Sequence, residues 1–205
     1  MITNNISTLS TNWPSITAAL ITITVCGIGL SVSLPLLSML FELRGVSSFL
    51  IGVNTALSTA GSIAISPFVT PLALRFGVFR LMIFAVIIAA ILLLSFFWIT
   101  NFWLIIIARF GFHATIAIII ILSEFWINIA VSPDRRGVVL GIYATMFSLG
   151  FMIGSFILKI TVNIHSITPL LYSAIIFIFA LIPIFIARQQ IPQISKEACK
   201  NNFNI

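Results

Sequence analysis

Residues 81–99 read LMIFAVIIAAILLLSFFWI and contain no charged side chain. After the polar pair Thr100-Asn101, a second apolar run begins at Phe102 and continues to residue 127. One helix needs about 20 apolar residues to cross the hydrocarbon core of a bilayer. Strands of a membrane barrel would instead alternate polar and apolar residues over about ten positions. The two runs therefore predict two antiparallel transmembrane helices joined by a very short turn.

Similar apolar runs recur along the whole chain. They cover residues 16–41, 50–73, 79–99, 102–127, 138–160 and 168–187. The segments 1–15 and 188–205 are polar, and the first of them has no cleavage site of the kind that ends a signal peptide. We expect an all-α membrane protein with six transmembrane helices between a short N-terminal segment and a polar tail.

The composition agrees with this class and leaves little material for catalysis. Of 205 residues, 60% are hydrophobic and 7% are charged, whereas soluble domains are about 25% charged. Neither His113 nor His165 belongs to an H-E-x-x-H motif or accompanies a glycine-rich serine element. The two cysteines, Cys26 and Cys199, have no metal or redox spacing. We expect no metal, no cofactor and no enzymatic activity, with an intramembrane enzyme as a remote alternative.

Basic residues indicate how the helices are oriented. The formal net charge is +6, but basic and aromatic residues are not interleaved in any cluster, so nucleic acid is not an expected partner. One side of the predicted bundle carries Arg75, Arg80, Arg135, Arg136, Arg188, Lys196 and Lys200. The other side carries only Arg44 and Lys159. Because basic loops stay in the cytoplasm, we expect a plasma (inner) membrane protein with both termini cytoplasmic.

The two halves of the chain are weakly similar to each other. A shift of 89 residues places Gly61 on Gly150 and Ser66 on Ser155. The first three predicted helices thereby correspond to the last three, and because three is odd the two copies cross the membrane in opposite directions. Inverted repeats of this kind are typical of secondary transporters. We also expect Gly137, Gly141, Gly150 and Gly154 to let their helix approach its neighbours closely.

Two segments resemble a known family. Residues 71–80 read PLALRFGVFR, which resembles the loop motif between the second and third helices of the major facilitator superfamily. The match covers Leu72, Arg75, Gly77 and Arg80, whereas Thr70 and Leu74 replace the usual glycine and aspartate. Without that aspartate, the acidic latch of the family motif is missing.

The later motifs follow in the order that the same family shows. Residues 123–128 read SEFWIN, and Arg136-Gly137 and Tyr143 follow, which is similar to a branch of small bacterial members of uncertain substrate. The G-x-x-x-G-P pattern of drug antiporters is only half present, because Ser155 follows Gly154. The resemblance implies a secondary active transporter that moves a small solute by alternating access.

The resemblance covers the N-terminal six-helix half of that superfamily's usual architecture of two halves. A truncated gene product, a split gene with a separately encoded partner, and a homodimer of halves would share this sequence pattern. We expect little or no transport by this chain alone, and a second six-helix half or a second copy as its partner within the bilayer. The alternative is a non-functional fragment or a membrane scaffold.

Arg109 is the main candidate for a substrate-binding residue. An ionised side chain inside a span costs about 2.5–3.5 kcal/mol unless it faces protein or water. Arg109 lies about 12 Å below the outer surface, and His113 shares its helix face. The pair either lines a central cavity and binds an anionic group or counter-ion, or has only a structural role. In the structural alternative, Arg109 is directed outward or bonds to helix carbonyls, and His113 is neutral and packed. Asn54 either lines the same cavity or binds a neighbouring helix, and Arg109 slightly favours an anionic or zwitterionic solute.

Glu124 is the main candidate for gating or coupling. It lies about 22 Å along the helix from Arg109, so the two side chains cannot pair. Glu124 could form an ion pair that closes the inward gate, carry a coupling proton, or lie at headgroup level. The basic residues near it are Arg75, Arg80, Arg135 and Arg136. Further candidates for gating or coupling are Arg75, Gly77, Arg80 and Arg136. Asp134, Arg135 and Arg136 together fit a topology anchor.

Overall fold

A computed structural model of the protein describes residues 13–161 and 168–188. Within these ranges the chain is helical and contains no strand. The helices are α1 (Trp13–Leu43), α2 (Ser48–Phe76), α3 (Val78–Trp98), α4 (Phe102–Ala130), the short 3-10 helix η1 (Pro133–Arg135), α5 (Arg136–Thr161), α6 (Thr168–Phe179) and α7 (Leu181–Ile186). His165, Lys196, Lys200 and Cys199 lie outside the described residues, as does most of both terminal segments.

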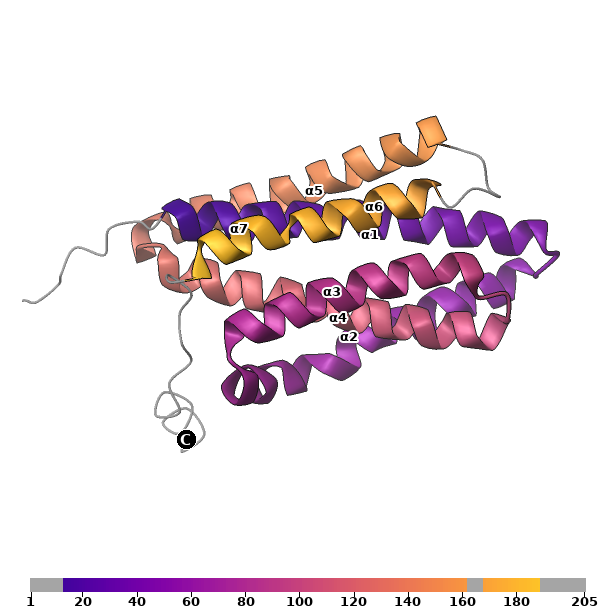
Figure 1. The fold of residues 1–205 in the computed structure, drawn as a ribbon, viewed down its shortest axis with the longest axis horizontal. Helices are drawn as coiled ribbons and strands as arrows, with labels where there is room; N and C mark the ends of the chain where they lie inside the picture. Colours follow the sequence, from indigo (N-terminus) through magenta and orange to yellow (C-terminus); the bar gives the residue numbers. More distant parts are fainter. Residues whose placement is uncertain (1–12, 162–167, 189–205) are drawn as a thin grey trace, which may run out of the picture.

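Six of these helices, with α6 and α7 counted as one, are long and apolar enough to cross a membrane, as the sequence predicts. Successive spans run in opposite directions along the long axis of the molecule (Figure 1). The start of α1, the end of α7 and the α2–α3 and α4–α5 connections lie at one end of the bundle, here called the loop-rich end. Five described basic residues belong to this end, and Arg44 and Lys159 belong to the other.

The helices form two layers. In the first layer α5, α1, α4 and α2 lie side by side in that order, and in the second layer α3 and α6–α7 cover α4 and α1 (Figure 1). Aromatic rings fill the space between the layers: the ring of Phe112 on α4 meets Phe96 of α3 at 5.8 Å and Phe177 of α6 at 6.4 Å between centroids. We call the other side of the first layer, which α3 and α6 do not cover, the open face.

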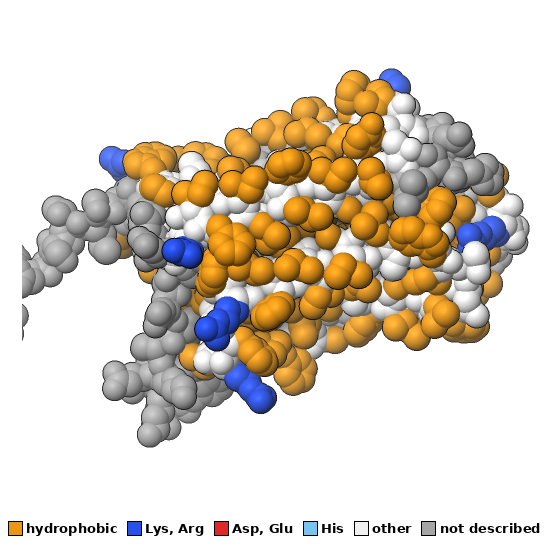
Figure 2. Space-filling model, viewed as in Figure 1, with side chains coloured by type: hydrophobic (Ala, Val, Ile, Leu, Met, Phe, Trp, Pro, Cys, Tyr) orange, Lys and Arg blue, Asp and Glu red, His pale blue; other side chains and the backbone are white. Residues whose placement is uncertain are grey.

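The two layers have different surfaces. Hydrophobic side chains cover most of the α3–α6 side, with Lys and Arg toward its two ends (Figure 2). The mean hydropathy is 2.9 for α3 and 2.5 for the span formed by α6 and α7, but 1.4 for α2 and 1.8 for the span that contains α5. Exposed hydroxyl groups occur on both α2, at Thr59 and Ser66, and α5, at Thr145 and Ser148. The α3–α6 side therefore matches a lipid-facing surface better than α2 and α5 do.

The packing repeats in an inverted manner. The largest helix–helix interfaces join α1 to α5 and α2 to α4, which are equivalent pairs under the repeat. Gly61 of α2 lies against the carbonyl group of Phe110 on α4, and Gly150 of α5 lies against that of Thr24 on α1. A side chain at either glycine would collide with backbone, so each repeat needs a glycine at the same position. Figure 1 shows that α2 and α5 run in opposite directions.

Only two of the four glycines of α5 lie in a close helix–helix contact of the kind that the sequence predicts. Gly150 and Gly154 touch α1, and a Cβ at Gly154 would lie 2.7 Å from the carbonyl oxygen of Ile28. A Cβ at Gly137 or Gly141 would meet no atom within 4 Å. The prediction of close packing is therefore wrong for Gly137 and Gly141, which are exposed, because the nine-residue spacing from Gly141 to Gly150 places the two glycine pairs on opposite sides of the helix.

Two short connections are explained by their residues. Gly77 links α2 to α3 by itself, with φ at 82° and ψ at 146°, and its N–H donates to the carbonyl of Ala73 at 2.9 Å. This backbone conformation is nearly restricted to glycine. Between α3 and α4, the Asn101 side chain accepts from the N–H groups of Trp103 and Leu104 at 2.9 and 3.3 Å and caps α4.

The sixth span is interrupted at Ala180, which the sequence-based reading of residues 168–187 as one helix did not foresee. Pro183 has no N–H, so it cannot bond to the carbonyl of Phe179 four residues earlier. The N–H of Ala180 is shared between the carbonyls of Ile176 and Phe177, each at 3.1 Å, which is typical of a tightened helix end. The proline therefore accounts for the separate α7.

Candidate functional site

A cavity of about 350 Å³ lies between α4 and α5 and against α1. Its walls are formed by Ile23, Ile120, Glu124, Leu140, Tyr143, Ala144 and Phe147. None of these residues belongs to α3, α6 or α7, although those helices cover the opposite side of the first layer. The cavity therefore opens on the open face.

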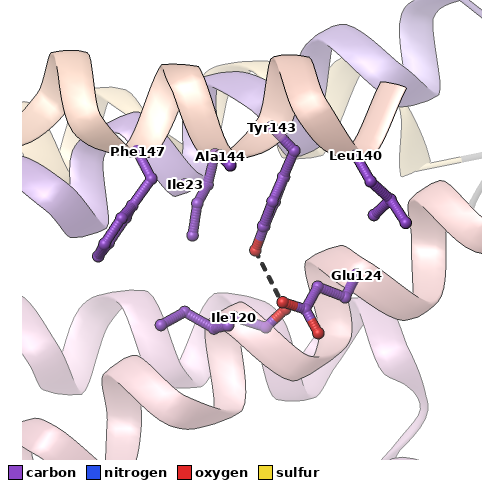
Figure 3. Close-up of a pocket in the computed structure, with 7 residues that line it drawn as sticks. All are labelled: Ile23, Ile120, Glu124, Leu140, Tyr143, Ala144 and Phe147. Atoms are coloured by element: carbon purple, nitrogen blue, oxygen red, sulfur yellow. Dashed lines mark hydrogen bonds between the residues drawn. The ribbon is translucent and has the colours of Figure 1, made fainter. Parts of the chain in front are cut away.

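Glu124 and Tyr143 are the polar groups of the cavity wall. Figure 3 shows Tyr143 extending from α5 toward α4, where Ile120 and Glu124 lie one helical turn apart. The Tyr143 hydroxyl donates to the carbonyl of Ile120 at 3.4 Å, a long hydrogen bond that leaves the Glu124 carboxylate free. The rest of the wall is aliphatic or aromatic, so the carboxylate is the one charged group among the described residues that line this cavity.

Glu124 forms no ion pair within the described part of the chain. One of the basic candidates, Arg136, is bound elsewhere, because it donates from Nη2 to the carbonyl of Asn128 at 3.0 Å. The Asn128 side chain in turn donates to the backbone carbonyl of Glu124 at 2.9 Å. Arg136 thus joins the start of α5 to the end of α4, one turn beyond Glu124.

Arg109 is buried, with 1% of its surface exposed, and lies between α4 and α2. Its Nη1 donates to Oδ1 of Asn54, which is itself fully buried. Asn54 and Arg109 lie near the starts of α2 and α4, which are at the end of the bundle opposite the loop-rich end, and the arginine side chain meets Asn54 in this part of the protein. Arg109 therefore contacts protein there and does not reach the surface.

Arg109, Asn54 and His113, here called the Arg109 cluster, contain polar atoms that have no hydrogen-bond partner in the described part of the chain. Nη2 of Arg109, Nδ2 of Asn54 and Nε2 of His113 are all buried and have no hydrogen-bond partner among the described residues. The first two can only donate hydrogen bonds. His113 is 7% exposed, and the hydroxyl of Ser62 on α2 donates to its backbone carbonyl at 3.1 Å. The cluster thus offers donors to an acceptor group.

The candidates in the α2–α3 loop, Arg75, Gly77 and Arg80, belong neither to the Arg109 cluster nor to the wall of the cavity at Glu124. Arg75 and Arg80 are exposed on either side of the Gly77 turn, and the Arg75 guanidinium lies 5.5 Å from the centre of the Phe76 ring. Neither side chain forms a hydrogen bond or ion pair with another described residue. At this turn Gly77 has a clear structural role, while the two arginines supply unpaired positive charge at the loop-rich end.

The structure thus divides the predicted site residues into separate groups. It brings Asn54, Arg109 and His113 together, and it joins Glu124 to a cavity that does not include them. Sequence reasoning missed Phe147 and Ile23 and gave Tyr143 no role. Spacing on α5 could have suggested Leu140, Tyr143, Ala144 and Phe147 as one face, because they follow helical periodicity.

Comparisons with known proteins identify a family. The family model for the Major Facilitator Superfamily matches residues 19–198, which include nearly all of the described helices. No curated protein matches the sequence. The family match agrees with the six apolar helices and with the resemblance noted in the loop and in the fourth and fifth spans.

Proposed function

Because this chain belongs to the Major Facilitator Superfamily, we propose that it is one six-helix half of a secondary active transporter that moves a small solute by alternating access. Members of this family are generally transporters, and the chain is a multi-pass membrane protein. The observation that carries the proposal is the cavity at Glu124. It opens on the open face, where a second six-helix unit would supply the missing wall.

The hydroxyl groups of α2 and α5 support a protein or water environment for the edges of the open face. Four exposed hydroxyl groups donate to carbonyls of their own helices and to no other described residue: those of Thr59, Ser66, Thr145 and Ser148. Lipid acyl chains form no hydrogen bonds with hydroxyl groups, whereas small polar residues are typical of helix–helix interfaces in membranes. We propose that a second half, encoded separately or supplied by a second copy, covers this face.

Thiol labelling tests alternating access without a known substrate. In a Cys26→Ala, Cys199→Ala background, Ala144→Cys places one thiol in the cavity wall, and Ile91→Cys places one on the apolar surface of α3. We expect a membrane-impermeant maleimide to label position 144 from either side of native membranes and position 91 from neither. Labelling of position 144 from one side only, under all conditions, would contradict alternating access.

We propose Glu124 as the gating or coupling residue, with Arg75, Arg80 and Arg136 as its basic partners in a closed state and Gly77 as the turn that presents the first two. The same labelling separates these roles. If an ion pair closes the inward gate, Glu124→Gln increases labelling of position 144 from the cytoplasmic side. If Glu124 carries a coupling proton, labelling varies with pH and Glu124→Gln removes that variation.

We propose Arg109, Asn54 and His113 as the group that recognises the solute, which would then be anionic or zwitterionic. The three unpartnered nitrogens support this, since a carboxylate or phosphate could accept from all of them. The cluster is closed in this conformation, so the site would open during the transport cycle. In an active assembly, Arg109→Gln should weaken the solute's affinity, and unaltered affinity would count against an anionic solute.

A further inference from the structure

A second cavity, of about 340 Å³, lies at the loop-rich end between the first turns of α1 and α5. Its lining side chains are Trp13, Ile16, Leu20, Arg135, Val138, Val139 and Ile142. Both helices run away from this end, so the lining extends for about 10 Å along them, from Trp13 to Leu20 and from Arg135 to Ile142. Ile16 and Val139 are buried and form its floor, while Trp13 and Val138 are exposed at its edges. We call this cavity the α1–α5 groove.

Among the described residues that line the α1–α5 groove, Arg135 is the one that is charged. Its side chain forms no hydrogen bond or ion pair with the rest of the described chain. Its neighbours differ: Arg136 is bound to the carbonyl of Asn128, and Asp134 is exposed outside the groove lining. The groove thus combines a long apolar wall with a cation that pairs with no described residue.

We propose that the α1–α5 groove binds a phospholipid with a net anionic headgroup. The headgroup phosphate accepts hydrogen bonds from Arg135, and one acyl chain lies along the aliphatic floor. A polar solute would form no hydrogen bonds with the apolar side chains of this wall. A lipid without net charge would fill the wall but would offer Arg135 less attraction, because basic residues near the surface bind anionic lipids electrostatically. Trp13 lies where aromatic side chains meet headgroups.

Trp13 makes the proposal measurable. Trp98 and Trp103 belong to the opposite end of the bundle and are replaced by phenylalanine, while Trp126 has no exposed surface and contributes a constant signal. The full chain is placed in nanodiscs of phosphatidylcholine that contain a minor fraction of a lipid with a brominated acyl chain. That lipid is either phosphatidylglycerol or phosphatidylcholine, and bromine quenches tryptophan fluorescence only at close range.

The expected result is stronger quenching of Trp13 by brominated phosphatidylglycerol, corresponding to about fivefold enrichment of this lipid at the groove. Arg135→Gln should remove the preference. Arg80→Gln is the matched control, because Arg80 is an exposed basic residue without a side-chain partner at the same end but outside the groove, and it should keep the preference. Ile142→Phe, which narrows the groove and keeps Arg135, should reduce quenching by both lipids.

Three outcomes would overturn the proposal. Equal quenching by the two lipids would show ordinary boundary lipid. Equal loss with Arg135→Gln and Arg80→Gln would show attraction to the general surface charge. A preference that appears only after deletion of residues 1–12 would assign the groove to that segment of the chain. Because the readout is lipid contact, none of these outcomes depends on whether the chain transports a solute.

Discussion

At the scale of single residues, the main feature is a cation without an acid. Arg109 is buried between α2 and α4, and its one hydrogen-bond partner among the described residues is the amide oxygen of Asn54. A buried charge that loses its partner is costly, because neither water nor another group replaces the lost interaction. Asn54 therefore holds Arg109 in place whether or not the pair also meets a solute.

A double-mutant cycle measures this dependence. We expect Asn54→Leu to lower the free energy of unfolding by roughly 1–2 kcal/mol, since it removes a hydrogen bond to a charged group inside the membrane. In an Arg109→Met background the same change should cost little. Reversible unfolding by dodecyl sulfate in mixed micelles gives both values. Thr59→Ala on the same helix should be nearly neutral, and strictly additive costs at positions 54 and 109 would refute the coupling.

Sequence reasoning identified Arg109 and left its partner open. Asn54 was recognised as a polar residue within a span, but two helices whose residues are 55 positions apart can be paired only by the three-dimensional packing. For Glu124 the sequence supplied basic residues nearby and the structure shows no ion pair among the described residues. Proximity along the chain does not specify the direction of a long side chain, so the ion pair stays a prediction about another state.

At the scale of helices, close contacts between backbones determine how the elements pack. Gly61 and Gly150 occupy equivalent positions of the two repeats, and each brings its helix against a carbonyl group of the neighbour. The sequence predicted this equivalence from a shift of 89 residues, and the packing agrees with it. Sequence reasoning did not show which of the two glycine pairs of α5 touches α1, because both pairs have the same four-residue spacing.

Alanine substitutions on α5 distinguish contact glycines from exposed ones. We expect Gly150→Ala to cost about 1–3 kcal/mol of unfolding free energy, since its methyl group would collide with the Thr24 carbonyl. Gly141→Ala on the same helix meets no atom within 4 Å and should be neutral or gain up to about 1 kcal/mol from helix propensity. Equal effects of the two substitutions would show that α5 does not pack on α1 through Gly150.

The α2–α3 turn offers a second test at this scale. Gly77→Ala forces a side chain into a conformation with φ near 82°, so we expect a loss of about 1–3 kcal/mol. Gly52→Ala in α2, whose Cβ would meet no atom within 4 Å, is the control and should not destabilise the helix. Thermal unfolding in detergent compares the two variants. An unaffected Gly77→Ala protein would show that this turn adopts a different backbone conformation.

At the scale of the whole molecule, the sequence predicted the class and the number of helices because apolar length is a strong signal. The layer order, the open face and the Glu124 cavity depend on which helices touch, and apolar side chains on all sides of a span carry little information about that. The break at Ala180 was missed because one proline inside an apolar run does not interrupt hydropathy.

The orientation of the molecule follows from its basic residues and remains a prediction. Thr100 belongs to the α3–α4 turn and Asp134 to η1, at opposite ends of the bundle. In the cysteine-free background, we expect an impermeant maleimide added to intact cells, after removal of any outer barrier, to label Thr100→Cys but not Asp134→Cys. Disruption of the cells should make position 134 reactive. The reverse pattern would place both termini outside.

The central claim is that the open face meets a second six-helix unit. A photoreactive amino acid at position 148 lies one turn beyond the cavity residue Ala144 on α5, and the same group at position 91 lies on the apolar surface of α3. After irradiation of native membranes, mass spectrometry identifies what each position has captured. We predict that position 148 captures a six-helix membrane protein or a second copy of this chain, while position 91 captures lipid. Lipid capture at both positions would contradict the claim.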